Sequence, residues 1–336
     1  METAYVSAMH RERYELTQNE ETFYGRLKTA NFYNTKELVE FPTVGDRVEI
    51  VKNDTGDSSI IKVLERKSVF KRQNTTQGLP DQAVAANFDY VFIVMSLNHD
   101  FHMTKLERYL TVAWQSGGTP VIILSKADLC EEKESYVAQL AMDAPGVAVH
   151  CISARTGEGM TELKPYVKDG KTIVLLGSSG VGKSSLVNAL LGKEEMETGG
   201  IREADSQGRH TTTYKQCFLL PQIIQLPNGE EITGGGKIID TPGMRKLLMG
   251  ENAEGSQSTF SDIEELATQC RFSDCQHKKE PGCAVKKALE DGTLDERHWK
   301  TYLSLQREEA YSKERKQIMM RKIGKTRKEI KTRGRL

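Results

Sequence analysis

A glycine-rich segment contains the residue types and spacing that bind phosphate groups. It has the pattern Gly-x4-Gly-Lys-Ser, with an apolar run at 172–176 before it and a helix-like segment at 185–191 after it. The glycines let backbone N–H groups turn toward phosphate oxygens, and the helix N-terminus adds partial positive charge. Lys183 is placed to reach the β- and γ-phosphates, and the Ser184 hydroxyl to ligate Mg²⁺. The predicted nucleotide contacts here are Gly177, Ser178, Ser179, Gly180, Val181, Gly182, Lys183, Ser184 and Ser185.

A second motif, Asp240-Thr-Pro-Gly243, follows another apolar strand. An aspartate there can hold Mg²⁺ through water, and the Gly243 N–H can sense a γ-phosphate. Between the two motifs lies a run of three threonines, one of which would close over Mg²⁺ only when the γ-phosphate is present. The candidates are Thr211, Thr212 and Thr213, and the sequence does not decide which of them closes over Mg²⁺.

The position after the Asp-x-x-Gly motif carries Met244, whose thioether cannot orient an attacking water. Unaided hydrolysis should therefore be slow. The nearest substitute is His210, because an imidazole accepts a proton near neutral pH. The predicted catalytic set is His210 with Lys183 and Thr212. An alternative is that His210 contacts a partner or caps its loop.

Two further segments resemble the guanine-binding motifs of GTPases. Ser125-Lys-Ala-Asp128 resembles Asn-Lys-x-Asp, in which the carboxylate accepts hydrogen bonds from guanine and the lysine stem packs on the base. Ser125 replaces the usual asparagine, which leaves an ATP-using enzyme as an alternative. Ser153-Ala154 resembles the Ser-Ala motif, whose backbone N–H contacts guanine. The predicted base contacts are Ser125, Lys126, Ala127, Asp128, Ser153 and Ala154.

These guanine motifs precede the phosphate loop, whereas an ordinary GTPase has them after it. A sheet entered at a different strand, which is a circular permutation, accounts for that order. The apolar strands expected are 90–95, 121–124, 147–152, 172–176 and 237–239, with helices at 103–115, 132–141 and 183–191. Continuous apolar runs indicate strands buried on both faces, hence a mainly parallel α/β sheet.

A cysteine cluster follows the nucleotide motifs. Cys270, Cys275, His277 and Cys283 place three thiols and one imidazole within 14 residues, a common closed tetrahedral set for structural zinc. Unpaired core thiols or a disulfide are the alternatives. Helices are expected at 260–269, 283–289 and 295–316, whereas the other three cysteines are predicted to be small core residues.

The ends of the chain differ in charge and pattern. Five short strand-like runs at 5–9, 13–16, 22–27, 47–51 and 59–64 predict a small OB-like β-barrel, and the basic residues at 66–72 indicate a charged linker. The chain has 47 basic and 47 acidic residues, yet residues 313–336 hold 11 basic and two acidic ones, a net +9. This tail either binds RNA or is simply a solvated end. Neither a signal peptide nor a membrane-length apolar run is present, which predicts a cytoplasmic protein without membrane contact.

Together, the barrel, the permuted motifs and the Cys3His cluster closely resemble the bacterial ribosome small-subunit-dependent GTPase A family, known as RsgA or YjeQ. The resemblance implies a multidomain α/β protein: an OB-like barrel (1–77), a circularly permuted P-loop GTPase domain (78–248), a helical zinc-binding domain (249–312) and a basic tail (313–336). It further implies GTP hydrolysis stimulated by the 30S ribosomal subunit, contact with 16S rRNA, one structural Zn²⁺, Mg²⁺ with GTP, and a monomer that leaves the subunit after hydrolysis to GDP. A nucleotide-gated RNA-binding module, in which hydrolysis only resets binding, is the alternative.

Overall fold

The computed structural model describes residues 2–10, 13–19, 21–28, 41–72, 82–97, 101–178, 180–196, 215–240, 259–272, 275–278 and 280–307. They form two compact units. The first contains the described parts of Met1–Arg72, Gln82–His102 and Ser116–Leu247, and the second those of Met103–Gln115 and Leu248–Leu336. Within the described residues, no helix combines the length and apolar character that crossing a bilayer requires.

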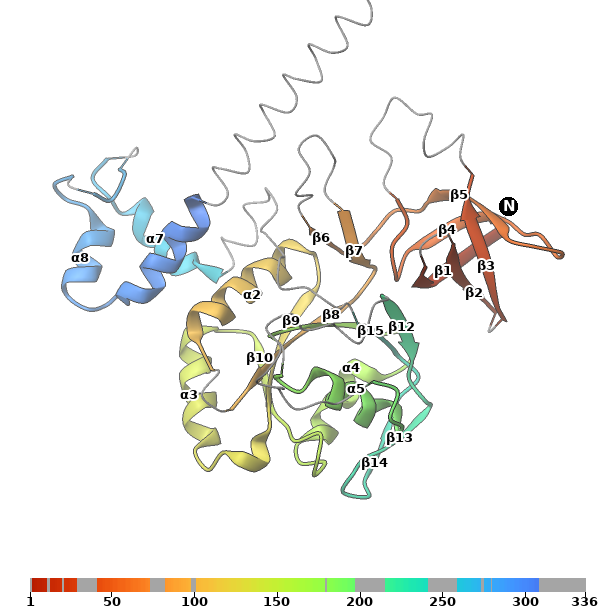
Figure 1. The fold of residues 1–336 in the computed structure, drawn as a ribbon. Helices are drawn as coiled ribbons and strands as arrows, with labels where there is room; N and C mark the ends of the chain where they lie inside the picture. Colours follow the sequence, from red (N-terminus) through yellow and green to blue (C-terminus); the bar gives the residue numbers. More distant parts are fainter. Residues whose placement is uncertain are drawn as a thin grey trace, which may run out of the picture. The chain divides into compact units, whose positions relative to one another are not determined.

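The first unit begins with a five-stranded β-barrel, as the sequence predicts (Figure 1). Its strands pair in the order β1-β2-β3-β5-β4, and β4 returns to β1 to close the barrel. Alternate residues point inward, so small and branched side chains such as Ala4, Leu16 and Ile60 fill the interior. The strands are β1 (Glu2–Met9), β2 (Tyr14–Gln18), β3 (Glu21–Leu27), β4 (Arg47–Val51) and β5 (Ser58–Val63).

The expectation of a charged linker after the barrel is wrong for the residues described there. Strand β6 (Val69–Arg72) pairs with β7 (Gln82–Ala86), and Phe70 stacks on Phe88 with ring centroids 4.8 Å apart. Arg66 is buried against the fully buried carboxylate of Asp46, with Nε and Nη2 each donating at 2.7 Å. This segment therefore contains a buried aromatic side chain and a buried bidentate ion pair, and is not a solvent-exposed linker.

The nucleotide-motif region forms a mostly parallel sheet in the order β10-β9-β8-β11-β15-β12. The first five strands are parallel neighbours, and β12 pairs antiparallel with β15. All five strands expected from apolar runs are present. β11, the strand before the phosphate loop, lies between β8 and β15 in this sheet. The sheet therefore accommodates the permuted order of the nucleotide motifs. The strands are β8 (Tyr90–Ser96), β9 (Thr119–Ser125), β10 (Ala148–Cys151), β11 (Thr172–Leu176), β12 (Gln216–Leu219) and β15 (Lys237–Asp240).

Short helices and one hairpin complete this unit. The expected helix at 183–191 is α5 (Lys183–Leu191), and the expected 132–141 helix is α3 (Lys133–Asp143). The hairpin of β13 (Ile223–Gln225) and β14 (Glu231–Thr233) was not expected, because its strands are too short for a clear alternating pattern. The remaining elements are η1 (Ala127–Leu129), η2 (Met160–Leu163) and α4 (Lys164–Val167).

The second unit is helical in its described residues. It contains α2 (Met103–Gln115), with the bounds that the sequence predicts, α7 (Ser261–Thr268) and α8 (Ala284–Glu290). A final helix covers 296–307 of the expected 295–316, and the rest of that expectation lies outside the described residues. An aromatic cluster joins these helices: Phe260 packs on Tyr302, which stacks on Trp299.

Candidate functional site

The phosphate loop connects β11 to α5, as its motif requires. Gly177 and Gly182 have φ angles of 156° and 94°, which favour glycine over other residues. A Cβ at Gly177 would lie 2.4 Å from the Val94 carbonyl oxygen, so the loop also needs glycine for its close approach to β8. Lys183 donates from Nζ to the carbonyl oxygens of Gly177 and Ser178 at 3.0 and 2.5 Å. The lysine thus folds over the loop that would hold the phosphates.

The guanine-motif candidates lie at the end of β9, next to this loop. The Ser125 hydroxyl is 2.6 Å from the Val181 carbonyl oxygen and 3.1 Å from that of Met95. Lys126 donates from Nζ to the Gly180 carbonyl oxygen at 2.9 Å. Two segments more than 50 residues apart in sequence are therefore hydrogen-bonded to each other. No sequence pattern predicts this connection, because any residue can supply a backbone carbonyl acceptor.

The geometry of Lys126 and its neighbours presents this motif from a rigid turn. Lys126 has φ 60° and ψ 38°, a left-handed conformation that costs a non-glycine residue energy unless its surroundings hold it. The Ala127 N–H donates to the Ile152 carbonyl oxygen at 3.0 Å, which ties the turn to the end of β10. Asp128 follows within η1, half-buried.

The Ser153-Ala154 segment follows directly on this connection. The Ser153 N–H donates to the Glu158 carbonyl oxygen at 2.9 Å, and its hydroxyl accepts from the Thr156 N–H at 3.2 Å. Ala154 is partly buried against the core. The loop is closed on itself, so the Ser-Ala candidates and the Asp128 turn are fixed beside each other at the ends of adjacent parallel strands β9 and β10.

Asp240 ends β15, the strand on the other side of the phosphate-loop strand, and is 8% exposed. Ser184 is half-buried in the first turn of α5. The two residues predicted to hold Mg²⁺ therefore belong to neighbouring strands: Asp240 is the last residue of β15, and Ser184 lies beyond the loop that follows β11. Several predicted residues lie outside the described ones: Ser179, His210, Thr211, Thr212, Thr213, Gly243, Met244 and the tail 313–336.

The Cys3His cluster predicted from spacing is assembled in the second unit. The four ligand atoms all lie within 4.8 Å of one another. The sulfurs of Cys270 and Cys283 are 3.9 Å apart, and His277 Nδ1 lies 3.6 and 3.4 Å from them. A tetrahedral zinc with bonds of about 2.3 Å to sulfur and about 2.0 Å to nitrogen requires a sulfur–sulfur edge of roughly 3.8 Å and a sulfur–nitrogen edge of roughly 3.5 Å. Because a disulfide needs about 2.05 Å, that alternative does not fit these thiols.

The surroundings of two members of the cluster, His277 and Cys270, favour the forms that bind a metal. Burial lowers the pKa of His277, which keeps the imidazole neutral at physiological pH, although the charge of Glu280 opposes this. Burial raises the pKa of Cys270, whereas hydrogen bonds from backbone N–H groups of α8 lower it. The net shift of this pKa is downward, which favours the thiolate. The His277 ring meets Trp299 edge-on at 5.7 Å, which orients it. The donor set is therefore consistent with a zinc site.

The other thiols are outside this cluster. Cys130, Cys151 and Cys217 are free and partly exposed as whole residues. Burial raises the pKa of the Cys151 and Cys217 thiols to about 11, so they remain protonated and weakly reactive.

Known proteins resemble this chain over most of its length. The model of the RsgA GTPase family matches residues 63–249. Small ribosomal subunit biogenesis GTPase RsgA 2 of Listeria monocytogenes is 50% identical over 306 residues, which cover 91% of this chain and 83% of that protein. Small ribosomal subunit biogenesis GTPase RsgA of Methanosarcina acetivorans is 38% identical over 287 residues, covering 85% and 74%.

Solved structures show the same architecture. The crystal structure of YjeQ from Thermotoga maritima has a TM-score of 0.64 and 28% identity, covering 92% of this chain and 98% of that one. The structure of YloQ, a circularly permuted GTPase, has a TM-score of 0.60 and 25% identity, covering 93% and 96%.

Proposed function

The chain belongs to the RsgA family of small ribosomal subunit biogenesis GTPases, and we propose that it hydrolyses GTP on the 30S subunit late in maturation, with hydrolysis to GDP driving its release. It is a GTP hydrolase by this membership. Association with the small subunit is what the relatives' names state of those proteins. The proposal extends that association to this chain and adds contact with 16S rRNA, stimulation by the subunit and action as a monomer.

The observation that best supports a guanine-nucleotide site is the hydrogen-bonded connection between the guanine motif and the phosphate loop. Ser125 and Lys126 bond to carbonyl oxygens of Val181 and Gly180, so base and phosphate subsites form one rigid unit. We assign the base contacts to Ser125–Asp128 with Ser153 and Ala154. Asp128 selects guanine over adenine, because adenine lacks the N1–H and 2-amino donors that a carboxylate binds.

The phosphate and metal contacts follow from the motifs. The loop 177–185 holds the phosphates, with Lys183 released from its carbonyl partners to the β- and γ-phosphates. Ser184 would hold Mg²⁺ directly and Asp240 would hold it through water, and Gly243 would contact the γ-phosphate. Thr212 and His210 stay predictions for the switch and for water activation.

The Cys3His cluster would hold one structural zinc through Cys270, Cys275, His277 and Cys283. Four protein ligands leave the metal no open position for substrate, so it stabilises the second unit and takes no part in hydrolysis. A cytoplasmic location, where thiols stay reduced, suits both this site and the ribosomal partner.

The decisive experiment compares steady-state GTP hydrolysis by the full chain with and without purified 30S subunits. Turnover that rises with subunits and not with 50S subunits supports the proposal. Equal turnover in both would contradict it. An Asp128→Asn variant should lose preference for GTP over xanthosine triphosphate, because an amide in place of the carboxylate reverses one hydrogen-bond polarity.

The alternative function is an RNA-binding module that hydrolysis only resets. A variant that binds GTP but cannot hydrolyse it distinguishes this alternative from the proposal. Under that alternative, subunits mature normally with a chain that binds GTP but cannot hydrolyse it. Under the proposal, such a chain accumulates on the subunit and maturation stalls.

A further inference from the structure

The β13–β14 hairpin reaches the guanine loop, by which we mean residues 153–159. Within this loop Gly157 is buried, although its neighbours Thr156 and Glu158 are exposed. The hairpin tip covers it on one side: a Cβ on Gly157 would lie 2.7 Å from Asn228 Cγ and 2.8 Å from the Asn228 backbone nitrogen. Gly157 also has a φ of 85°, so its backbone conformation favours glycine as well. The tip and the loop are therefore in close contact at these two residues.

Hydrogen bonds within the hairpin fix the position of Asn228. Its Oδ1 accepts from the Glu230 N–H at 3.1 Å, and its Nδ2 donates to the Glu230 carboxylate at 2.5 Å. The turn is closed by the Leu226 N–H, which donates to the Glu230 carbonyl oxygen at 2.8 Å, and the Leu226 side chain is buried in the core. Ile224 and Ile232, which pair across the two strands, are buried in the same core. The tip is thus anchored to the core of the nucleotide-motif region.

The base of the hairpin is attached to α4, the helix that follows the guanine loop. The Gly236 N–H donates to the Val167 carbonyl oxygen at 2.9 Å. A Cβ on Gly236 would lie 2.6 Å from that oxygen, so the two backbones are as close as glycine allows. The hairpin therefore contacts the segment 153–168 at both its tip and its base. It continues directly into β15, the strand that ends at Asp240.

One peptide unit links Gly157 to the predicted base contact. The Gly157 N–H donates to the Ser153 carbonyl oxygen at 2.8 Å. That carbonyl belongs to the same planar trans peptide as the Ala154 N–H, and in such a peptide the two groups point in opposite directions. Holding the Ser153 oxygen therefore sets the direction of the Ala154 N–H. A displacement of Gly157 would rotate this peptide and turn the N–H away.

We infer that Asn228 is a positioning residue for guanine recognition: it holds Gly157 in place, and Gly157 aims the Ala154 N–H at guanine O6. This rests on the proposed function, which assigns Ala154 to the base. Asn228 acts through the guanine loop, so its role is indirect. Its loss should weaken recognition of O6 and leave recognition of the N1–H and 2-amino groups, which Asp128 binds, unchanged.

The test compares the binding of GDP and 6-thio-GDP by the full chain. Sulfur is a weaker hydrogen-bond acceptor than oxygen, so the ratio of the two dissociation constants reports on the O6 contact. Asn228→Ala removes the Cγ that packs on Gly157 and both side-chain bonds to Glu230. GDP should then bind about fivefold more weakly, which is about 1 kcal/mol, the net worth of one typical hydrogen bond. Binding of 6-thio-GDP should change little, so the ratio falls.

Inosine diphosphate supplies a second ratio, because it lacks the 2-amino group and keeps O6. Its binding should weaken by the same factor as that of GDP, so the ratio of GDP to inosine diphosphate affinity should be equal in Asn228→Ala and in the unmodified chain. A fall in both ratios would overturn the proposal, because the whole base site would then have loosened.

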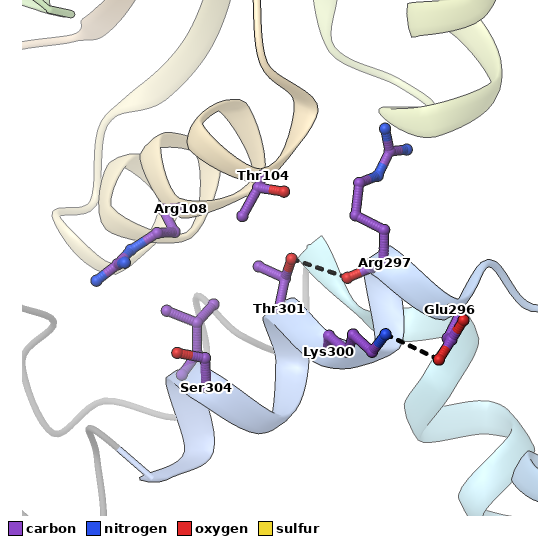
Figure 2. Close-up of a pocket in the computed structure, with 8 residues that line it drawn as sticks. Thr104, Arg108, Glu296, Arg297, Lys300, Thr301 and Ser304 are labelled. Carbon is purple, nitrogen blue, oxygen red and sulfur yellow. Dashed lines mark hydrogen bonds and ion pairs between the residues drawn. The ribbon is translucent and has the colours of Figure 1, made fainter.

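Two matched controls remove polar side chains elsewhere. Asn53→Ala removes the same kind of bond, from the Thr55 N–H to Asn53 Oδ1, in the β4–β5 turn of the barrel. Ser304→Ala removes an exposed hydroxyl from the second unit, where Ser304 lines a groove beside α2 (Figure 2). Both controls should keep both ratios. Equal losses in the controls and in Asn228→Ala would contradict the proposal.

The two possible failures give different results. If the unmodified chain prefers GDP to 6-thio-GDP and Asn228→Ala keeps that preference, the role of Asn228 is refuted while the assignment of Ala154 stands. If the unmodified chain binds the two nucleotides equally, the assignment of Ala154 in the proposed function is refuted as well.

Discussion

Replacing Ser125 with alanine should weaken nucleotide binding without unfolding the chain. Ser125 is 5% exposed, and its hydroxyl has the Val181 carbonyl oxygen 2.6 Å away. The single hydroxyl hydrogen is donated chiefly to this acceptor, because the Met95 oxygen lies further away, at 3.1 Å. The alanine variant leaves the Val181 carbonyl without this donor and removes one of the two hydrogen bonds, with that of Lys126 to Gly180, that join the phosphate loop to the guanine motif.

The size of the effect follows from the burial of that hydrogen bond. Removing one partner of a buried pair costs about 1–3 kcal/mol. Of this, we expect about 1.4 kcal/mol to appear as lost nucleotide affinity, which is a tenfold rise in the Kd for GDP. Isothermal calorimetry or a fluorescent GDP analogue measures it directly. The energy acts on the loop's position, so affinity for GDP and for GTP should fall together.

The matched control is Ser116→Ala, because Ser116 is also buried, at 6% exposure, and lies before the opposite end of β9. It removes a buried hydroxyl from the same strand region but none near the phosphate loop. If Ser125→Ala binds GDP as tightly as the unmodified chain, the hydroxyl does not hold the loop. If both variants lose affinity equally, the loss comes from general destabilisation.

Three other outcomes are expected. Arg66→Ala should lower the free energy of unfolding by about 3–5 kcal/mol in urea denaturation, because it leaves the Asp46 carboxylate buried without its cation; a loss below about 1 kcal/mol would contradict this. Burial lowers the pKa of His298, whereas its hydrogen bonds to Asp262 and Glu107 raise it. The hydrogen bonds outweigh the burial, so the pKa is about 9 instead of the ordinary 6.5. The stabilisation is therefore complete below pH 6.5 and lost as pH rises through about 9, so the stability difference between the unmodified chain and His298→Gln should shrink across that window, and a constant difference would refute these hydrogen bonds. Chelation should remove one zinc per chain and lower the melting temperature of the second unit while leaving GDP affinity unchanged; a chain that contains no zinc when purified without chelator would refute the site.

Local pattern determined a large part of this protein. Strands with continuous apolar runs, such as Tyr90–Ser96, and the glycine-rich turn before Lys183 are specified by neighbouring residues, so both were predictable. The ligand spacing from Cys270 to Cys283 fits within one short loop and helix start, so the cluster was predictable too. The β6–β7 pair was missed because four basic residues surround the apolar pair at Val69 and Phe70.

Tertiary structure decided everything that joins distant segments. The bond from Ser125 to the Val181 carbonyl oxygen has no sequence signature, because any residue supplies the acceptor. The bridge from His298 to Glu107 spans 191 positions, and each residue alone is an ordinary charged or polar side chain. Composition and spacing fix which groups a local segment can present. Only the packing of strands and helices fixes which of those groups meet, because burial and hydrogen-bond geometry are properties of the folded chain.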